Sequence, residues 1–115
     1  MEKPEIVCIC GSSRFWKTWM AENVRLTDLG FIVLAIDLRH IIGKPPTRRR
    51  KEHLDWLHKR KIDIADWVWV LDVGGYIGQS TSSEIVYATK IGKLVRFLSS
   101  VFPDYEEPDL PLKIV

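Results

Sequence analysis

Four short apolar runs, rich in β-branched and aromatic residues, alternate with longer stretches in which apolar residues recur at helical spacing. Such runs are typical of strands that are buried in a parallel sheet. Strands that alternate with helices form a parallel sheet, because each crossover helix returns the chain in the same direction. We therefore predict an α/β fold, a small Rossmann-like or flavodoxin-like parallel sheet of about four or five strands with helices on both faces. The predicted strands are 6–10, 31–36, 67–71 and 94–98.

Three helices are expected between these strands. The first covers about 14–29, where Gly30 provides a stop, and the third covers about 82–91 and stops at Gly92. The second begins at Thr47 with Arg48 and continues to about residue 65. The side chains predicted on the packed face of the second helix are Leu54, Leu57, Lys61 and Ile64.

The length of 115 residues fits a single compact domain. We assign the α/β domain to residues 1–98 and a proline-rich, acidic C-terminal arm to residues 99–115, where three prolines stand among four acidic residues. This composition predicts an extended arm whose last residues, 112–115, pack against the domain.

Composition and charge exclude several classes of protein. An apolar fraction of 46% and a charged fraction of 28% are typical of a folded globular protein. A net charge of +2 is too small to indicate nucleic acid as a partner, whereas small anions are natural ligands. No apolar run has the length of a membrane span, and the N-terminus lacks the pattern of a signal peptide. We expect a cytoplasmic protein with no membrane partner.

The two cysteines, Cys8 and Cys10, both lie in the first predicted strand. Alternate residues of a strand point to the same face, so the pair is poorly placed for a disulfide, and free thiols indicate a reducing compartment. No further cluster of Cys or His has ligand spacing, because His40, His53 and His58 are scattered. We therefore expect no metal ion and no cofactor.

Three loops should meet beyond the carboxyl ends of the strands, where open α/β sheets bind their ligands. They follow the first three strands and cover 10–14, 37–47 and 72–83. The second loop begins with an acid, Asp37, and the third with another, Asp72. The chemistry of the chain is concentrated in these loops.

The first loop combines a flexible glycine, Gly11, with two hydroxyl side chains and a guanidinium, Ser12, Ser13 and Arg14. Such groups at the start of a helix can bind a phosphate or a carboxylate. A helix cap formed by Ser12 or Ser13 explains the same residues without a ligand. Both interpretations stay open.

Thr81 and Glu84 stand at the spacing of a capping box at the start of the third helix. That box is a complete structural explanation of the two residues. The functional alternative rests on the glycine-rich loop and the hydroxyl residues around them. A carboxylate in the first turn of a helix is held ionised by the helix field, which suits a nucleophile.

Four segments together have a recognisable pattern. An apolar strand leads into Cys-Gly-Ser-Ser-Arg-Phe at 10–15, and the third strand leads into Gly-Gly-Tyr-Ile-Gly at 74–78. Ser-Thr-Ser-Ser-Glu-Ile-Val-Tyr-Ala at 80–88 and Gly-Lys-Leu-Val at 92–95 follow. Over about residues 5–98 the chain resembles the nucleoside 2-deoxyribosyltransferase-like superfamily, which includes base-exchanging transferases and hydrolases that release bases from nucleoside monophosphates.

The resemblance implies roles for two acids. In the superfamily a glutamate of the third helix, followed by a hydrophobic residue and a Tyr-Ala-like pair, attacks the anomeric carbon of the sugar, and Glu84 matches it. Asp72 matches the second acid, which protonates or orients the leaving base, although a loop cap is an alternative for Asp72. The implied mechanism is similar to that of a retaining glycosidase and needs no metal.

The resemblance and the loops also predict how a nucleoside or nucleotide is held. The hydroxyls and amides of 80–83, helped by Ser12 or Arg14, are expected to cradle a 5′-phosphate, and Tyr76 or Phe15 to stack on the base. Family members commonly form oligomers, so a homo-oligomer is expected. The predicted substrate-binding residues are Gly11, Ser12, Ser13, Arg14, Phe15, Asp37, Gly75, Tyr76, Gly78, Ser80, Thr81 and Ser82.

Departures from the family pattern leave alternatives to this enzyme open. Hydrolases of the family interleave glycines between the phosphate-binding serine and the nucleophile, and transferases carry an acid ahead of that turn, whereas this chain has neither. A non-catalytic nucleotide-binding module, acting as a sensor or sponge, is therefore the second hypothesis. The basic stretch 48–61 indicates either a solvated helix face or a contact with a nucleic acid or an acidic partner.

Overall fold

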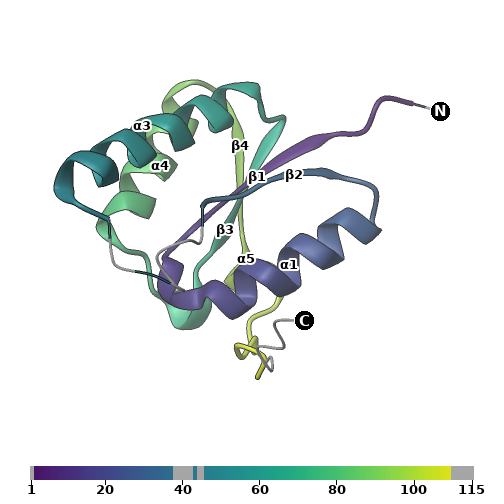
Figure 1. Ribbon diagram of the computed structural model, residues 1–115. Coiled ribbons are helices and arrows are strands. Elements are labelled where there is room, and N and C mark those ends of the chain that lie inside the picture. The colour runs from purple at the N-terminus through teal and green to yellow at the C-terminus, as the bar shows by residue number, and fades with distance from the viewer. Residues whose placement is uncertain (1, 38–42, 44–45, 110–115) are drawn as a thin grey trace.

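The computed structural model describes residues 2–37, 43 and 46–109. Its strands form one all-parallel sheet in the order β2-β1-β3-β4 (Figure 1), which confirms the predicted α/β fold class. This is the order of the first four strands of a flavodoxin-like sheet. The strands are β1 at Ile6–Gly11, β2 at Ile32–Leu34, β3 at Trp67–Leu71 and β4 at Leu94–Phe97.

Helices cover both faces of the sheet, as predicted. In Figure 1, α3 and α4 lie together on one face and α1 lies on the other, with the strands between them. The short α5 follows β4 directly and packs on the α1 side through Leu98. The helices are α1 at Trp16–Asp28, α3 at Arg48–Ile64, α4 at Gln79–Lys90 and α5 at Leu98–Val101.

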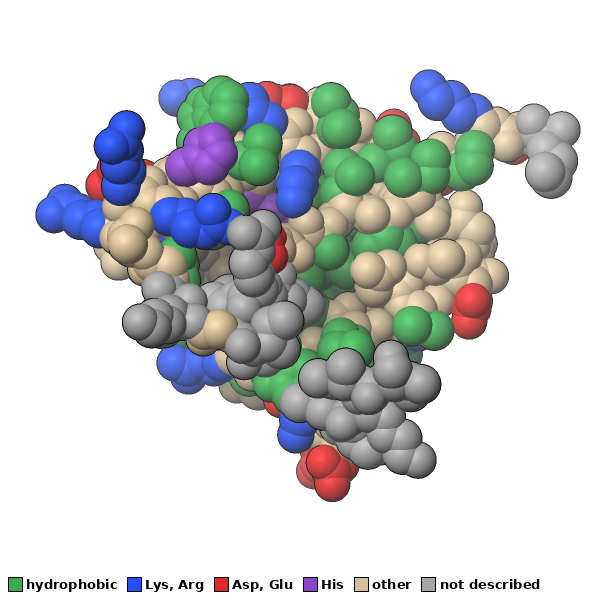
Figure 2. All heavy atoms as spheres, viewed as in Figure 1, with side chains coloured by type: hydrophobic (Ala, Val, Ile, Leu, Met, Phe, Trp, Pro, Cys, Tyr) green, Lys and Arg blue, Asp and Glu red, His purple; other side chains and the backbone are tan. Residues whose placement is uncertain are grey.

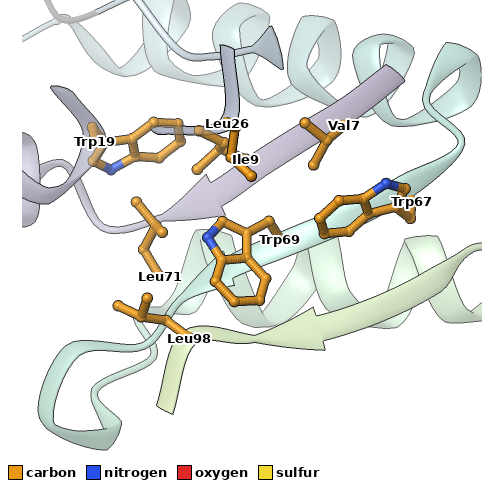
Figure 3. Packing of buried hydrophobic residues seen from close by; sticks show 8 residues of the cluster. All are labelled: Val7, Ile9, Trp19, Leu26, Trp67, Trp69, Leu71 and Leu98. Atoms are coloured by element: carbon orange, nitrogen blue, oxygen red, sulfur yellow. The ribbon is translucent and has the colours of Figure 1, made fainter. Parts of the chain in front are cut away.

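The α1 face of the sheet holds the large core side chains. Those of β1 and β3 come from alternate positions, because successive strand residues point to opposite faces, and the others come from α1 and α5. Figure 3 shows these residues gathered on one side of the two strands. Their large volume fills the layer under α1. The buried members of this cluster are Val7, Ile9, Trp19, Leu26, Trp67, Trp69, Leu71 and Leu98.

The opposite face carries smaller side chains. Cys8 and Cys10 of β1 and their neighbours on β3 are fully buried beneath α3 and α4, and both cysteines are free thiols. Small side chains let the two helices approach the strands closely. The buried members of this cluster are Cys8, Cys10, Ile62, Ala65, Val68, Val70 and Ala88.

The face of α3 that packs on the sheet differs from the predicted one. Leu57 and Ile64, expected in the packed face, are exposed, whereas His58 and Ile62 are the buried residues of the helix. The apolar stripe of α3 is short and interrupted by charged residues, so the sequence does not distinguish the buried His58 from the basic residues of the exposed face. The start of the helix is as predicted, because the Thr47 hydroxyl caps it by accepting from the Arg50 amide at 3.3 Å.

Several predicted boundaries are also corrected. β2 is shorter than the predicted 31–36, and β4 ends at Phe97 because the chain turns into α5. The arm that was expected to be extended from residue 99 therefore begins inside a helical turn. The loop residues 38–42, 44 and 45, which include His40, and the predicted packed end at 112–115 lie outside the described residues.

The tail after α5 binds back onto the N-terminal turn of α1. The Glu107 carboxylate accepts hydrogen bonds from the Thr18 amide at 3.2 Å and the Thr18 hydroxyl at 3.1 Å. Tyr105 donates its hydroxyl to the same Thr18 oxygen at 3.0 Å. The N-cap residue of α1 is Phe15, whose side chain cannot accept a hydrogen bond from the first amides of the helix. Glu107, 89 residues further along the chain, supplies an acceptor for one of them, the Thr18 amide.

Within the described ranges, no helix is both long enough and apolar enough to cross a lipid bilayer.

Replacing Glu107 with alanine (E107A) removes the acceptor of the Thr18 amide. We expect the free energy of unfolding to fall by about 1 kcal/mol, as for a lost helix cap, and urea denaturation measures it. E106A removes an exposed neighbouring carboxylate and is the control. It should change stability by less than about 0.5 kcal/mol. Equal losses in the two variants would contradict the capping role of Glu107.

Candidate functional site

A cavity of about 750 Å³ opens at the carboxyl ends of β1 and β3. The strand order reverses between these two strands, and in open α/β sheets ligands bind at that switch point. The walls are the segment after β1, the segment after β2, the N-terminal turn of α4 and one side of α3. Its volume lies within the range of small-molecule sites.

The cavity brings together residues from all three predicted loops. Five of the predicted site residues do not line the cavity: Arg14, Phe15, Asp72, Gly75 and Ser82. The predicted residues that do line it are Gly11, Ser12, Ser13, Asp37, Tyr76, Gly78, Ser80, Thr81 and Glu84.

Gly11 lets the first wall form. A Cβ atom at this position would lie 3.0 Å from the Leu71 Cβ, so the close approach of β1 to β3 favours glycine. Ser12 then caps the short 3-10 helix η1 at Ser13–Phe15 by accepting from the Arg14 amide at 3.3 Å. The capping role expected of Ser12 is therefore present, and the residue lines the cavity as well.

The N-terminus of α4 forms the opposite wall, but the predicted capping box is wrong. The helix begins at Gln79 with Gly78 as its N-cap, so Thr81 and Glu84 lie inside the helix. Glycine has no side chain to accept from the first amides, and the N–H groups of the first turn have no partner within the helix. Thr81, buried to 3% exposure, and Ser80 carry hydroxyls beside these amides.

Glu84 projects from the second turn of α4 and is 7% exposed. The expectation that the helix field holds it ionised is wrong in its premise, because no acidic residue lies in the first turn. Burial raises the pKa of the Glu84 carboxyl above its ordinary value, although the charge of His58 opposes this. The Oε2 atom lies 3.4 Å from His58 Nε2 and is buried without a hydrogen-bond partner among the described residues.

His58 is the residue that the sequence analysis missed. It is 4% exposed and reaches from α3 to β1, where Nε2 lies 2.9 Å from the Ile9 carbonyl oxygen. The same nitrogen lies 3.5 Å from Cys8 Sγ and 3.6 Å from Cys10 Sγ, so a histidine without ligand spacing in the sequence lies beside both cysteines in the fold. A signal was present, because His58 is four residues before the buried Ile62.

The thiols and the imidazole shift one another's pKa values. Burial alone would lower the pKa of His58, but the hydrogen bond and charge of Cys8 and the charge of Glu84 outweigh it and raise the pKa. The hydrogen bond from Cys10 and the contacts with His58 lower the pKa of Cys8 to about 6. The same pairing with Cys8, together with burial, raises the pKa of Cys10.

Basic residues of α3 line the cavity rather than forming only a solvated face. Figure 2 shows Lys and Arg side chains gathered over α3. Lys51 donates to the Ser80 hydroxyl at 2.7 Å and to Asp55 at 2.9 Å, which joins α3 to the N-terminus of α4. Arg50 pairs with Asp37 at 3.1 Å. The lining therefore holds three Lys or Arg side chains, Arg50, Lys51 and Lys61, which are matched in number by three acids, Asp37, Asp55 and Glu84.

The aromatic ring of Tyr76 lines the cavity and contacts two side chains that do not line it. The Arg14 guanidinium lies 4.0 Å from the centre of the ring, and the Phe15 ring meets it edge-on at 5.8 Å. Arg14 and Phe15 therefore act on the cavity through Tyr76. Gly75 belongs to the 3-10 turn η2 at Val73–Gly75, where its φ of +80° requires glycine.

Asp72 is held away from the cavity. Its carboxylate accepts hydrogen bonds from the Ser99 amide at 2.9 Å and from the Ser99 hydroxyl, and the residue is 5% exposed. The alternative of a loop cap is also wrong, because the Asp72 side chain does not cap the turn that follows it. Asp72 instead joins the end of β3 to the start of α5.

Comparisons of the chain with protein-family models, curated proteins and solved structures found no significant match. The resemblance to the nucleoside 2-deoxyribosyltransferase-like superfamily therefore stays a prediction.

Replacing Glu84 with glutamine (E84Q) should change how stability depends on pH. Because the folded state raises the pKa of Glu84 above the ordinary 4.5, it binds the proton more tightly than the unfolded chain. The free energy of unfolding of the wild type therefore falls as pH rises from 4.5 through the raised pKa. We expect E84Q to gain stability relative to wild type across that window, as measured by denaturation at a series of pH values. A difference independent of pH would contradict the shift.

Proposed function

We propose that the cavity binds a nucleoside monophosphate and that Glu84 attacks the anomeric carbon, which cleaves or transfers the N-glycosidic bond. The observation that carries the proposal is the position of Glu84, a buried carboxylate with an unsatisfied oxygen that lines the switch-point cavity. Buried ionisable groups with perturbed pKa values in a cavity are typical of catalytic sites. The resemblance in sequence gives this carboxylate the role of nucleophile.

The N-terminus of α4 supports the phosphate part of the proposal. Its first amides have no capping side chain, and the helix dipole favours a negative group there. Ser80 and Thr81 add hydroxyl donors, and Lys51 is already within 2.7 Å of the Ser80 hydroxyl. A dianionic phosphate at this point would replace Ser80 as the partner of Lys51 and gain a charge-assisted hydrogen bond.

Tyr76 supports the base part of the proposal. Its ring lines the cavity and is 40% exposed, so one region of the ring is available for stacking. Arg14 and Phe15, which do not line the cavity, contact the ring and hold it in place. Stacking on an aromatic side chain tolerates different bases, so this contact does not select one base over another.

The proposed chemistry proceeds in two steps. A Glu84 carboxylate oxygen forms a bond to the anomeric carbon while the carbon–nitrogen bond breaks, and the electron pair leaves with the base, which takes up a proton. Water then attacks the glycosyl ester, loses a proton and returns the Glu84 carboxylate, or a second base does so in transfer. The attack needs ionised Glu84, so turnover should fall as pH is lowered through its raised pKa.

A non-catalytic nucleotide-binding module is the second candidate, and the position of Asp72 favours it. The acid expected to protonate the leaving base is occupied by Ser99 and does not line the cavity. A site that keeps its anion-binding wall without that acid is suited to binding. The expected homo-oligomer stays a prediction.

The first test follows the release of free base by chromatography from ribo- and deoxyribonucleosides and their monophosphates. We expect release by the wild type and a loss of about 10⁴-fold or more in E84A, because the nucleophile is removed. S82A changes an exposed hydroxyl outside the lining and should retain turnover. Tight nucleotide binding without release by the wild type would replace the enzyme with the binding module, and release retained in E84A would overturn the mechanism.

The second test addresses the phosphate. K51A removes the cation beside the N-terminus of α4 and should weaken binding of a nucleoside monophosphate by about 10-fold or more, in line with one lost charge-assisted hydrogen bond. Binding of the matching nucleoside should change little. Lys59 lies on the same helix, donates to Ser83 and does not line the cavity, so K59A is the control. Isothermal calorimetry compares the variants, and equal effects on nucleoside and monophosphate would contradict the proposed cradle.

A further inference from the structure

Three side chains with metal-binding atoms meet in the layer between β1 and α3. The sulfur atoms of Cys8 and Cys10 and a ring nitrogen of His58 all lie within 4.8 Å of one another, and all three residues are buried. The two cysteines come from alternate positions of one strand and so face the same helix. Neither the sheet nor the proposed glycosidic chemistry requires two thiols at this place.

The distances fit a tetrahedral ion. With metal–sulfur bonds of about 2.3 Å and a metal–nitrogen bond of about 2.0–2.1 Å, the sulfur–nitrogen edge of a zinc tetrahedron is about 3.6 Å long. His58 Nε2 lies 3.5 Å from Cys8 Sγ and 3.6 Å from Cys10 Sγ. Both edges that involve the histidine therefore have the required length, and the ring has only to turn Nε2 from the Ile9 carbonyl oxygen toward the ion.

We propose that Cys8, Cys10 and His58 bind a Zn²⁺ ion, with the fourth position left to a water molecule. Three protein ligands and one open position are typical of zinc sites that take part in chemistry, and two cysteines with one histidine form a known ligand set. Glu84 stands beside this group, because its buried and unsatisfied Oε2 lies 3.4 Å from His58 Nε2. Its carboxylate is placed to accept a hydrogen bond from the bound water.

Binding exchanges protons for the ion in a balanced way. The zinc takes the place of the Cys10 thiol proton and of the one proton that the Cys8–His58 pair holds on either its sulfur or its ring, and His58 coordinates through Nε2 while it keeps one proton on Nδ1. Two protons leave to solvent for each ion bound. The hydrogen bond between Nε2 and the Ile9 carbonyl is given up in exchange for the metal–nitrogen bond.

The residues around the proposed zinc site determine how the ion enters and how tightly it binds. Both thiols are fully buried, whereas His58 lines the cavity, so the ion enters from the cavity side. The Nδ1 atom of His58 has no hydrogen-bond partner among the described residues. Histidine ligands without such support bind metal about 10- to 100-fold more weakly. We therefore expect a site that loses its ion to strong chelators during purification.

Cobalt titration tests the site without relying on any enzymatic activity. Reduced, chelator-treated protein is titrated with Co²⁺, whose absorption reports thiolate coordination and tetrahedral geometry. We expect a thiolate-to-cobalt band that saturates at one ion per chain and disappears when Zn²⁺ is added. No such band in the wild type would overturn the proposal.

Variants identify the ligands. C10S and H58Q should weaken Co²⁺ binding by at least about 100-fold, more than the loss of a supporting contact alone. H53Q replaces a second cavity histidine of α3 that is outside the group, and it should leave the band unchanged. Binding retained in C10S and H58Q, or lost in H53Q, would contradict the assignment. If C10S and H58Q do not fold, the release of two protons per Zn²⁺ by the wild type decides, and release of none would overturn the proposal.

Discussion

The register of β1 against β3 is the constraint on which the rest of the structure depends. The two strands pair in parallel from Val7 opposite Trp67 to Gly11 opposite Leu71, so both end at the same level. The segments that follow them then diverge to opposite sides and leave the cavity between them. A Cβ atom at position 11 would lie 3.0 Å from the Leu71 Cβ, so glycine lets the two strand ends lie close together below the cavity without a steric conflict.

Two buried carboxylates on opposite faces of the sheet differ in how far their hydrogen bonds are satisfied. Glu22 of α1 accepts from the Trp69 indole and from two nitrogens of Arg25, each at 2.8 Å, so its charge is fully compensated. Glu84 Oε2 lies 3.4 Å from His58 Nε2 and accepts no hydrogen bond within the described part of the chain. A satisfied carboxylate stabilises the native state, whereas an unsatisfied one costs free energy unless a ligand uses it.

The sequence predicted what depends on local pattern and missed what depends on partners far along the chain. Apolar runs were sufficient for the strands, and glycines located the ends of α1 and α4, where Gly30 and Gly92 adopt positive φ. The burial of His58 was missed because the packed stripe of α3 is mostly polar. The contact of Asp72 with Ser99 was missed because the two residues lie 27 positions apart and no local pattern indicates that pair. The cavity itself was anticipated, since strand ends and loop composition locate it.

The contact between tail and α1 has a consequence for ligand binding. Thr18, which holds the tail, is followed by Trp19, whose indole donates to the Ser12 carbonyl oxygen at 3.1 Å, and Ser12 lines the cavity. The tail at Tyr105 and Glu107 and the cavity therefore meet on the same short segment, which runs from Ser12 to Trp19. A ligand of the proposed kind that stabilised this segment would, by thermodynamic linkage, make the tail harder to detach and slow its proteolysis. By the same linkage, a chain cut before Tyr105 would bind that ligand more weakly, although Tyr105 and Glu107 do not line the cavity.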